Sequence, residues 1–405
     1  MGGSKRWVYL ILSTFILLFL GLIFAWSIFK IPISSVFSTW TESELSLTFT
    51  ISMVFFCLGG YLGGRLERRM HIRARLLLSA LLLVIGFGGV STINAEMQDT
   101  SLLLLYLFYG VLCGAGNGLA YNGIITTMTK WFSDKVGLAS GIMLMGFGLG
   151  GLILGSAINI LVARIGLNGS FRLLALVFLV ILILGAMIIQ EPKYQTQSHN
   201  PDLDSVENFT ASEMMRTSRF WFFALWAVSI NAGGLLVINS AANISVAYGG
   251  SAILGMIVSL FNGFGRIISG SCFDRYGRRV STLLVLLFMF IAAILLIIGS
   301  LVPSLVLIVS GIVFTGLAYG GGPTLTSAYS HTFGPQNFTT NFSILSFDML
   351  PAAIIGPMIS AQLLERSGGN YSTSFYAILV FTVIALGFWM LLNRASKRSN
   401  NEGNR

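Results

Sequence analysis

The sequence predicts an all-α membrane protein with twelve transmembrane helices in two six-helix halves. Of the 405 residues, 55% are hydrophobic and only 10% are charged, whereas soluble domains carry about 25% charged residues. The mean hydropathy is +0.83. Apolar stretches close to the ~20 residues needed to cross a bilayer recur along the chain, and one polar stretch divides them into two equal sets.

The expected spans follow one another with short polar turns between them. The first span comes after Lys5 and Arg6 and has no clear small-residue cleavage site, so we interpret it as a transmembrane helix and not as a cleaved signal. In order, the spans are residues 7–29, 45–64, 75–94, 101–123, 136–161, 171–190, 219–244, 251–273, 280–300, 303–327, 339–363 and 372–392.

The longest hydrophilic stretch lies between the sixth and seventh spans and holds no apolar run that could form a core. We therefore predict an N-terminal half over 1–190, a cytoplasmic linker over 191–218 and a C-terminal half over 219–393. The tail 394–405 is rich in charged and small polar residues, a composition typical of disorder.

The basic residues indicate the orientation of the chain. With the N-terminus in the cytoplasm, nineteen of the 24 Lys and Arg fall on the cytoplasmic side, four fall outside and Arg266 lies in the membrane. By the positive-inside rule, we expect a multi-pass protein of the cell membrane with both termini cytoplasmic. The net charge of +9 thus follows topology and does not indicate a nucleic-acid partner.

Two charged residues, Arg266 and Asp348, lie inside apolar spans. A charge at the bilayer centre costs at least about 2.5–3.5 kcal/mol, so it is usually functional. One buried cation and one buried anion suggest a site for a small anion and a proton. Two structural roles remain as alternatives: an ion pair that holds spans eight and eleven together, or, for Asp348, capping of backbone groups at a kink near Pro351.

The loop after span eight, 270-GSCFDRYGRR-279, resembles the signature G-x-x-x-D-R-x-G-R-R of the major facilitator superfamily. The resemblance implies a twelve-helix transporter fold and a latch that stabilises one conformation. A plain basic loop that sets topology is the alternative. The residues that match the signature are Gly270, Asp274, Arg275, Gly277, Arg278 and Arg279.

The equivalent loop of the first half, 60-GYLGGRLERRM-70, matches less well. It keeps Arg65 and Arg68, but Gly64 stands where the signature has Asp. Either Glu67 supplies the missing carboxylate or the latch acts only from the second half.

A closer resemblance runs through spans four and five, where 130-KWFSDKVGLASG-141 and the Gly-rich segment before it are similar to the oxalate/formate antiporter group. The bacterial monocarboxylate transporters are a neighbouring group. The resemblance implies that Arg266 binds the substrate carboxylate. The oxalate transporter's second buried cation, a lysine in span eleven, is replaced here by Met349. One cation beside the acid Asp348 suits a monoanion, with Asp348 as the titrating partner.

Weaker candidates surround these charges. Asn117 and Tyr121, one turn apart on span four, could orient a substrate or simply join helices. Lys30 could steer an anion at the outer mouth or snorkel to the headgroups. Tyr319 on span ten is a further candidate for substrate binding.

We therefore expect a proton-coupled secondary transporter of a small monocarboxylate such as lactate, pyruvate or formate, which works as a monomer by alternating access. The alternatives are an oxalate/formate-type exchanger with Lys30 as the second cation, and a membrane-embedded carboxylate sensor without flux. Efflux of hydrophobic cations is disfavoured by the buried Arg266. No Walker loop, metal-ligand spacing or nucleophile–base pair occurs in the sequence, so we expect no cofactor, no metal and no enzymatic activity.

Overall fold

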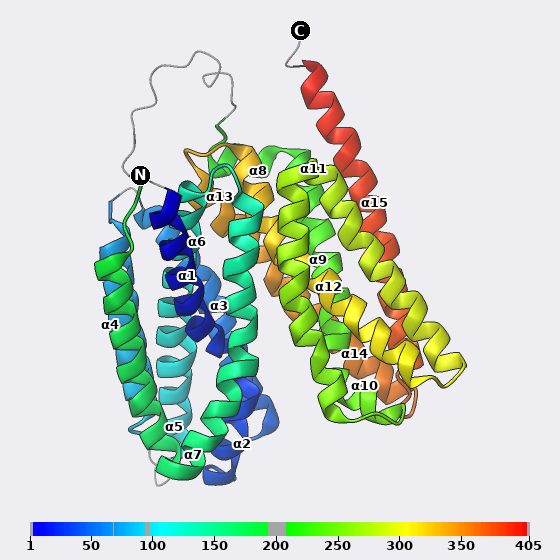
Figure 1. Ribbon diagram of the computed structural model, residues 1–405. Coiled ribbons are helices and arrows are strands. Elements are labelled where there is room, and N and C mark those ends of the chain that lie inside the picture. Colours follow the sequence, from blue (N-terminus) through cyan, green and yellow to red (C-terminus); the bar gives the residue numbers. More distant parts are fainter. Residues whose placement is uncertain (1–2, 68, 94–97, 193–207, 403–405) are drawn as a thin grey trace. The chain divides into compact units, whose positions relative to one another are not determined.

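The computed structural model describes residues 3–67, 69–93, 98–192 and 208–402, and every regular element in these residues is helical (Figure 1). The long apolar runs explain this outcome, because only helices satisfy all backbone hydrogen bonds within one segment inside a bilayer. Eleven of the described helices are long and apolar enough to cross a membrane.

The chain divides into two compact units. Unit 1 comprises Met1–Ser133 and Gly146–Leu203, and unit 2 comprises Asp134–Met145 and Asp204–Arg405. The elements of unit 1 are α1 (Gly3–Leu20), η1 (Gly21–Ala25), α2 (Trp26–Val36), α3 (Glu42–Leu66), α4 (Ile72–Val90), α5 (Gln98–Leu105), η2 (Tyr106–Cys113), α6 (Gly114–Trp131) and most of α7 (Val136–Ile188).

Unit 2 begins with the first residues of α7 and continues after the polar stretch. Its other elements are α8 (Ala211–Arg216), α9 (Ser218–Ile238), α10 (Ala241–Ala247), α11 (Ala252–Leu301), α12 (Leu305–Ser330), η3 (His331–Phe333), α13 (Phe338–Leu345), η4 (Ser346–Asp348), α14 (Met349–Arg366) and α15 (Ser372–Glu402).

The count of eleven candidate helices agrees with twelve spans, because the segment Ile253–Leu301 is 49 residues long and contains spans eight and nine. Gly277 separates these two spans with φ 74° and ψ −179°. This left-handed φ is readily adopted only by glycine. Gly166 has a similar conformation in α7, with φ 72°, and separates spans five and six.

Three of the predicted spans are interrupted helices. Span one contains the 3-10 turn η1, span four contains the π-helical segment η2, and span eleven contains the 3-10 turn η4. Such irregular turns release backbone groups from their usual helical partners and are frequent at functional sites. Two of the interruptions lie beside predicted site residues, Asn117 after η2 and Asp348 at the end of η4.

Within unit 1, α3, α4 and α1 pack against α6 (Figure 1). Glycines permit the α3–α6 contact: a Cβ on Gly118 would lie 1.9 Å from the carbonyl oxygen of Phe56, and a Cβ on Gly59 would lie 2.2 Å from that of Ala115. Small residues at helix contacts are the usual means of close packing in lipid. Within unit 2, α11 packs along α12, while α9 lies against α12, α14 and α15.

Two polar segments are more ordered than the sequence indicates. The tail predicted to be disordered from 394 continues α15 to Glu402, because it contains no Gly or Pro before Gly403. Of the predicted linker, residues 193–207 lie outside the described residues, but 211–216 form α8. A capping box between Thr210 and Glu213 starts this helix, and Met214 is fully buried, so this part of the linker belongs to unit 2.

Candidate functional site

Arg266 is buried in the first half of α11, with a relative exposure of 4%. Its Nε donates to Oδ1 of Asn262, one turn earlier on the same helix, at 3.1 Å. Its Nη1 donates to the backbone carbonyl of Leu144 at 2.7 Å. Both acceptors are neutral, so they orient the guanidinium without cancelling its charge.

Glycines on α7 bring the carbonyl of Leu144 within reach of α11. A Cβ on Gly141 would lie 2.5 Å from the carbonyl oxygen of Arg266, and a Cβ on Gly137 would lie 2.2 Å from that of Gly270. No side chain larger than hydrogen fits at either contact. The glycine spacing in 137-GLASG-141 thus positions the arginine, and both segments belong to unit 2.

Asp348 ends η4 and is 5% exposed. Its Oδ2 lies 2.9 Å from Oγ1 of Thr326 on α12. Tyr319 lies on α12 about two turns before Thr326. It is 7% exposed and interacts electrostatically with both Arg266 and Asp348. Unit 2 therefore gathers three predicted site residues, and the hydrogen bonds described above for Arg266 and for Asp348 involve different neutral groups.

The remaining three predicted substrate residues belong to unit 1. Nδ2 of Asn117 donates to the carbonyl of Leu20 at 2.8 Å. Because α1 gives way to η1 at this point, Asn117 supplies a donor to a helix end, which matches its alternative role in joining helices. Nζ of Lys30 donates to Oγ of Ser46 at 3.3 Å.

Tyr121 has aromatic neighbours within unit 1. Its ring centroid lies 5.0 Å from that of Phe56 and 4.8 Å from that of Phe147. These contacts fix the plane of the ring. The spacing of Asn117 and Tyr121 predicted a shared face, but their described contacts differ in kind, one polar and one aromatic.

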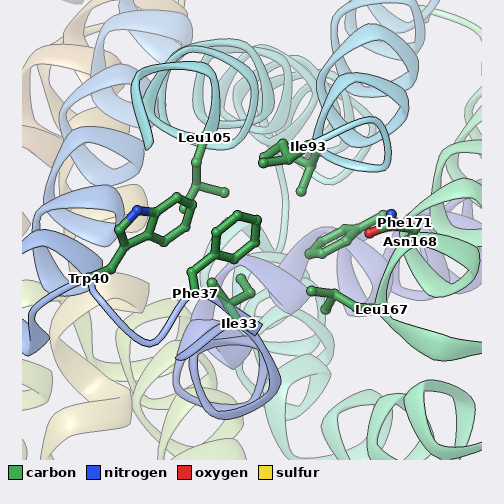
Figure 2. Close-up of a pocket in the computed structure, with 9 residues that line it drawn as sticks. Ile33, Phe37, Trp40, Ile93, Leu105, Leu167, Asn168 and Phe171 are labelled. Atoms are coloured by element: carbon green, nitrogen blue, oxygen red, sulfur yellow. The ribbon is translucent and has the colours of Figure 1, made fainter. Parts of the chain in front are cut away.

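Unit 1 also contains an apolar pocket whose walls come from α2, the turn after it, α5 and the Gly166 region of α7 (Figure 2). The rings of Phe37 and Trp40 stack there at 3.9 Å. No charged side chain lines it, so its chemistry does not suit an anion. The lining residues are Ile33, Phe37, Trp40, Val90, Ile93, Leu105, Leu167, Asn168 and Phe171.

The signature loop of α11 contacts the start of α7. Asp274 accepts hydrogen bonds from the N–H groups of Gly137 and Leu138, both at 2.7 Å. These are free donors of the first turn of α7, where the helix dipole favours a negative charge. The signature loop therefore binds the N-terminus of α7, which begins within the antiporter-like segment 130–141.

The arginines of the signature stack on tyrosines. Arg275 lies over Tyr276, with 5.2 Å to the ring centroid, and Arg278 lies over Tyr329 at 5.7 Å. In the first-half loop Arg65 stacks on Tyr61, while Arg68 lies outside the described residues. The backbone carbonyl of Arg279 accepts a hydrogen bond from Nε1 of Trp389 at 3.4 Å.

The first-half loop has its own charge cluster in unit 1. Glu67 forms an ion pair with Lys130 at the end of α6. Close by in sequence, the fully buried Arg75 donates to Glu191 at 3.3 Å, and Glu191 also accepts from the N–H of Ile72 at 2.8 Å. Glu67 thus provides a carboxylate in the loop that lacks the signature Asp.

Opposing effects act on the pKa of Glu191. Burial of its carboxyl works to raise the pKa, but hydrogen bonds from Ile72 and His71 and the positive charges of Arg75 and Lys130 outweigh burial and lower it below its ordinary value. The carboxylate form is therefore favoured in the folded protein.

Two contacts of the candidate site were not predicted from the sequence. One is the backbone carbonyl of Leu144, which carries no side-chain signal. The other is Thr326, which follows the run 320-GGGP-323. Because Pro323 has no N–H, the carbonyl of Tyr319 lacks its helical donor. This local defect is the signal that could have drawn attention to the polar residues just after it.

Comparison with known proteins now identifies the family. The family model described as Major Facilitator Superfamily matches residues 10–349. The chain belongs to the Major Facilitator Superfamily. Its fold resembles that of the proton:xylose symporter XylE bound to 6-bromo-6-deoxy-D-glucose, with a TM-score of 0.76, 14% identity and coverage of 97% of this chain and 96% of XylE. The chain is thus a membrane-embedded protein with the major facilitator fold.

Two curated relatives within this superfamily carry names that bear on substrate. The chain is 26% identical to the oxalate:formate antiporter of Oxalobacter formigenes over 398 residues, 96% of this chain and 92% of the relative. It is also 26% identical to monocarboxylate transporter 12 of Rattus norvegicus over 238 residues, 55% of this chain and 47% of the relative. The resemblance to the oxalate/formate antiporter group that was noted in the sequence is therefore confirmed.

Proposed function

We propose that this chain is a proton-coupled secondary transporter of a small monocarboxylate, working by alternating access with both termini in the cytoplasm. The observation that carries the proposal is the buried guanidinium of Arg266, oriented by two neutral oxygens. A planar guanidinium binds a carboxylate through two parallel hydrogen bonds and keeps its charge at any physiological pH.

Charge balance links the carboxylate to a proton. With Asp348 ionised, the empty site contains one positive and one negative charge. With the monocarboxylate bound and Asp348 protonated, it again contains one of each. Substrate alone or a proton alone would leave an unbalanced charge in the membrane, which is costly. The half-loaded states are therefore disfavoured, and the two species cross together.

The charge balance favours two states, the empty transporter and the transporter loaded with both substrate and proton. In this proposal only these two states convert between the inward-facing and outward-facing conformations. In this proposal, Asp274 at the N-terminus of α7 stabilises one orientation as the conformational latch. Tyr319, which interacts electrostatically with Arg266 in unit 2, is proposed to contribute to substrate binding. Asn117, Tyr121 and Lys30 are proposed to contribute to substrate binding from unit 1.

Uptake into proteoliposomes tests the role of Arg266. We expect Arg266→Ala to lower the uptake of labelled lactate or formate by about 30-fold or more, because truncating one partner of a buried charge pair costs at least about 2 kcal/mol. Arg266→Lys, which keeps the charge but loses the planar fork, should retain part of the activity. Arg164→Ala, at an exposed arginine of α7, is the matched control. Near wild-type uptake by a folded Arg266→Ala protein would exclude the proposed site.

The oxalate/formate exchanger is the second candidate, favoured by the 398-residue match to the antiporter. An inward proton gradient separates the two. Monocarboxylate uptake that the gradient stimulates supports symport, and Asp348→Asn should abolish the stimulation while leaving exchange of labelled for unlabelled substrate. Uptake that ignores the gradient and requires a trapped internal anion would identify an exchanger and make Lys30 the next residue to replace.

A further inference from the structure

We propose that Thr326 is a positioning residue that connects the protonation of Asp348 to the backbone of helix α12. The proposal rests on the proposed function, in which Asp348 carries the transported proton. In this proposal, the hydroxyl group of Thr326 changes its hydrogen bond to the backbone of α12 when Asp348 gains or loses a proton.

The proposal begins with a count of protons. Oγ1 of Thr326 lies 2.9 Å from Oδ2 of Asp348 and 3.1 Å from the carbonyl oxygen of Gly322. A hydroxyl group has one proton to donate, and a carbonyl or carboxylate oxygen can only accept. With an ionised Asp348, Thr326 can therefore satisfy only one of its two neighbours.

Protonation of Asp348 removes this conflict. The carboxylic acid then donates its proton to Oγ1 of Thr326, and Thr326 donates its own proton to the carbonyl of Gly322. Both short contacts become hydrogen bonds at once. When the proton leaves Asp348 for water, Thr326 turns its hydrogen toward the carboxylate and the bond to Gly322 is lost. No other reactant is needed, since only one proton is released.

Because both residues are buried, the acceptor to which the Thr326 hydroxyl donates affects the stability of α12. Thr326 is 2% exposed and Asp348 is 5% exposed, so bulk water does not replace the lost bond. The carbonyl of Gly322 keeps its helical donor, the backbone N–H of Thr326, and loses its second hydrogen bond. Gly322 lies in the Gly-Pro defect of α12, where Pro323 already withdraws one helical donor. The bond that depends on the proton thus lies beside a turn that already lacks one backbone hydrogen bond, the one from residue 323 to the carbonyl of Tyr319.

Asn231 of α9 lies beside the same turn. It is fully buried, and neither its Oδ1 nor its Nδ2 has a hydrogen-bond partner among the described residues. A Cβ on Gly322 would fall 2.2 Å from Oδ1 of Asn231. Unused buried amides are rare. In this proposal, the amide of Asn231 can donate a hydrogen bond to the backbone of α12 when the Thr326 hydroxyl donates to Asp348.

Few titratable groups face Asp348. The elements packed against η4 are α9, α12, α13 and α14. Tyr319 of α12 interacts electrostatically with Asp348 and with Arg266 of α11. Tyr329 is the other titratable residue of α12, and its ring stacks on that of Phe223. The sequence of α13 has no titratable residue, and α9 and α14 have theirs only at their outer ends, Arg219, Glu365 and Arg366. An effect on Asp348 can therefore be attributed to a small set of groups.

Infrared difference spectroscopy of the full-length protein in lipid nanodiscs tests the proposal without any substrate. The carboxylic-acid band of Asp348 is identified as the band that Asp348→Asn removes, and it is followed as the pH is changed. In Thr326→Val we expect this band to shift to the frequency of a less strongly hydrogen-bonded acid. We also expect its midpoint to move by about one pH unit toward alkaline pH, because hydrogen bonds to charged groups are about twice as strong as those to neutral groups.

Matched variants exclude a general packing effect. Thr326→Ser keeps the hydroxyl and should behave as the wild type. Thr315→Val removes a buried hydroxyl of α12 that bonds only to a backbone carbonyl, that of Gly311, and should leave the Asp348 band unchanged. If Thr326→Val does not fold, Thr326→Ala is measured in its place. An unchanged band and midpoint in the folded variant would overturn the proposal. So would an Asp348 that never titrates between about pH 4, near the ordinary aspartate value, and about pH 10.

Transport then separates this inference from the proposed function. In Thr326→Val, the pH at half-maximal monocarboxylate uptake should move by the same amount as the infrared midpoint. If the wild-type protein carries no carboxylate but the infrared shift is present, the proposed function fails and the role of Thr326 stands. If uptake is proton-driven but Thr326→Val changes neither midpoint, the proposed function stands and the role of Thr326 fails.

Discussion

At the scale of single residues, the sequence indicated the charged members of the site but not their partners. Arg266 and Asp348 are conspicuous because a charge in an apolar span is rare. Thr326 is inconspicuous, because threonines in membrane helices usually bond to their own backbone, as Thr315 and Thr324 do in the same helix. Its role depends on η4 lying beside α12, which no local pattern reveals.

A prediction at this scale concerns Glu191, whose pKa is lowered in the folded protein. A lowered pKa contributes stability that is present above the unfolded value of about 4.3 and is lost as the pH falls through the folded pKa. We expect Glu191→Gln to lower the unfolding temperature at pH 7 by about 2–4 °C, the shift for about 1 kcal/mol in a unit of this size, since the partial exposure of the pair limits its strength.

The measurement is a thermal scan in detergent between pH 7.5 and pH 4. The difference between wild type and Glu191→Gln should narrow as the solution is acidified, because the wild-type carboxylate becomes neutral. Glu365→Gln replaces an exposed glutamate and serves as the control. A difference that stays constant down to the lowest pH would show that Glu191 acts through packing and not through its charge.

At the scale of elements, interruptions of the helices are what the sequence analysis described least well. The spans were placed by length and hydropathy, which do not distinguish a straight helix from α5–η2–α6 or α13–η4–α14. Gly and Pro residues mark some of the breaks, as at Gly277 and Pro323, but η2 contains only one glycine and no proline. This segment packs against α3 and α4, which are distant in sequence from it and leave no local signal of the break.

A prediction at this scale concerns the contact between Asp274 and the start of α7. Replacing Asp274 with Ala removes two hydrogen bonds to free N–H groups, an interaction of the capping type worth about 1–2 kcal/mol. The equilibrium for local opening should rise by about five- to thirty-fold. Cys272, two residues away and partly buried, reports this opening through its rate of alkylation by a maleimide.

Internal controls are available in the same protein. Cys57 and Cys113 are buried and should remain unreactive in both proteins. Glu365→Ala removes an exposed acid of another helix, α14, and should leave the rate at Cys272 unchanged. Equal alkylation rates in wild type and Asp274→Ala would mean that the loop is held by other contacts, among them the stacking of Arg278 on Tyr329.

At the scale of the whole molecule, composition and periodicity were sufficient for the fold. Twelve apolar spans and a polar divide predicted the class, and the family match and the helical structure confirm it. Orientation remains a prediction based on the distribution of 24 basic residues. The grouping of the chain into units was less predictable. The segment Asp134–Met145 belongs to the C-terminal unit, although it precedes the linker by about fifty residues. Its glycines do not indicate from sequence which helix they contact.

Reporter fusions test the orientation. A green fluorescent protein joined after Arg405 should be fluorescent in a bacterial host, and alkaline phosphatase joined there should be inactive, because only the former matures in the cytoplasm. The reverse pattern is expected for phosphatase inserted at Gly166, on the opposite side. Active phosphatase at the C-terminus would show that the predicted topology is inverted and that the nineteen basic residues lie on the non-cytoplasmic side.

The membership of residues 134–145 in unit 2 has a consequence for how the protein can be assembled. A gene divided in the linker would encode two polypeptides, and the second would lack the N–H groups that bind Asp274 and the carbonyl that orients Arg266. The C-terminal polypeptide made alone should therefore fold incompletely and be degraded, and its partner, supplied in trans, should rescue it. During synthesis, the ribosome releases this short segment long before its neighbours exist, so the arginine site can be completed only after the second half has entered the membrane.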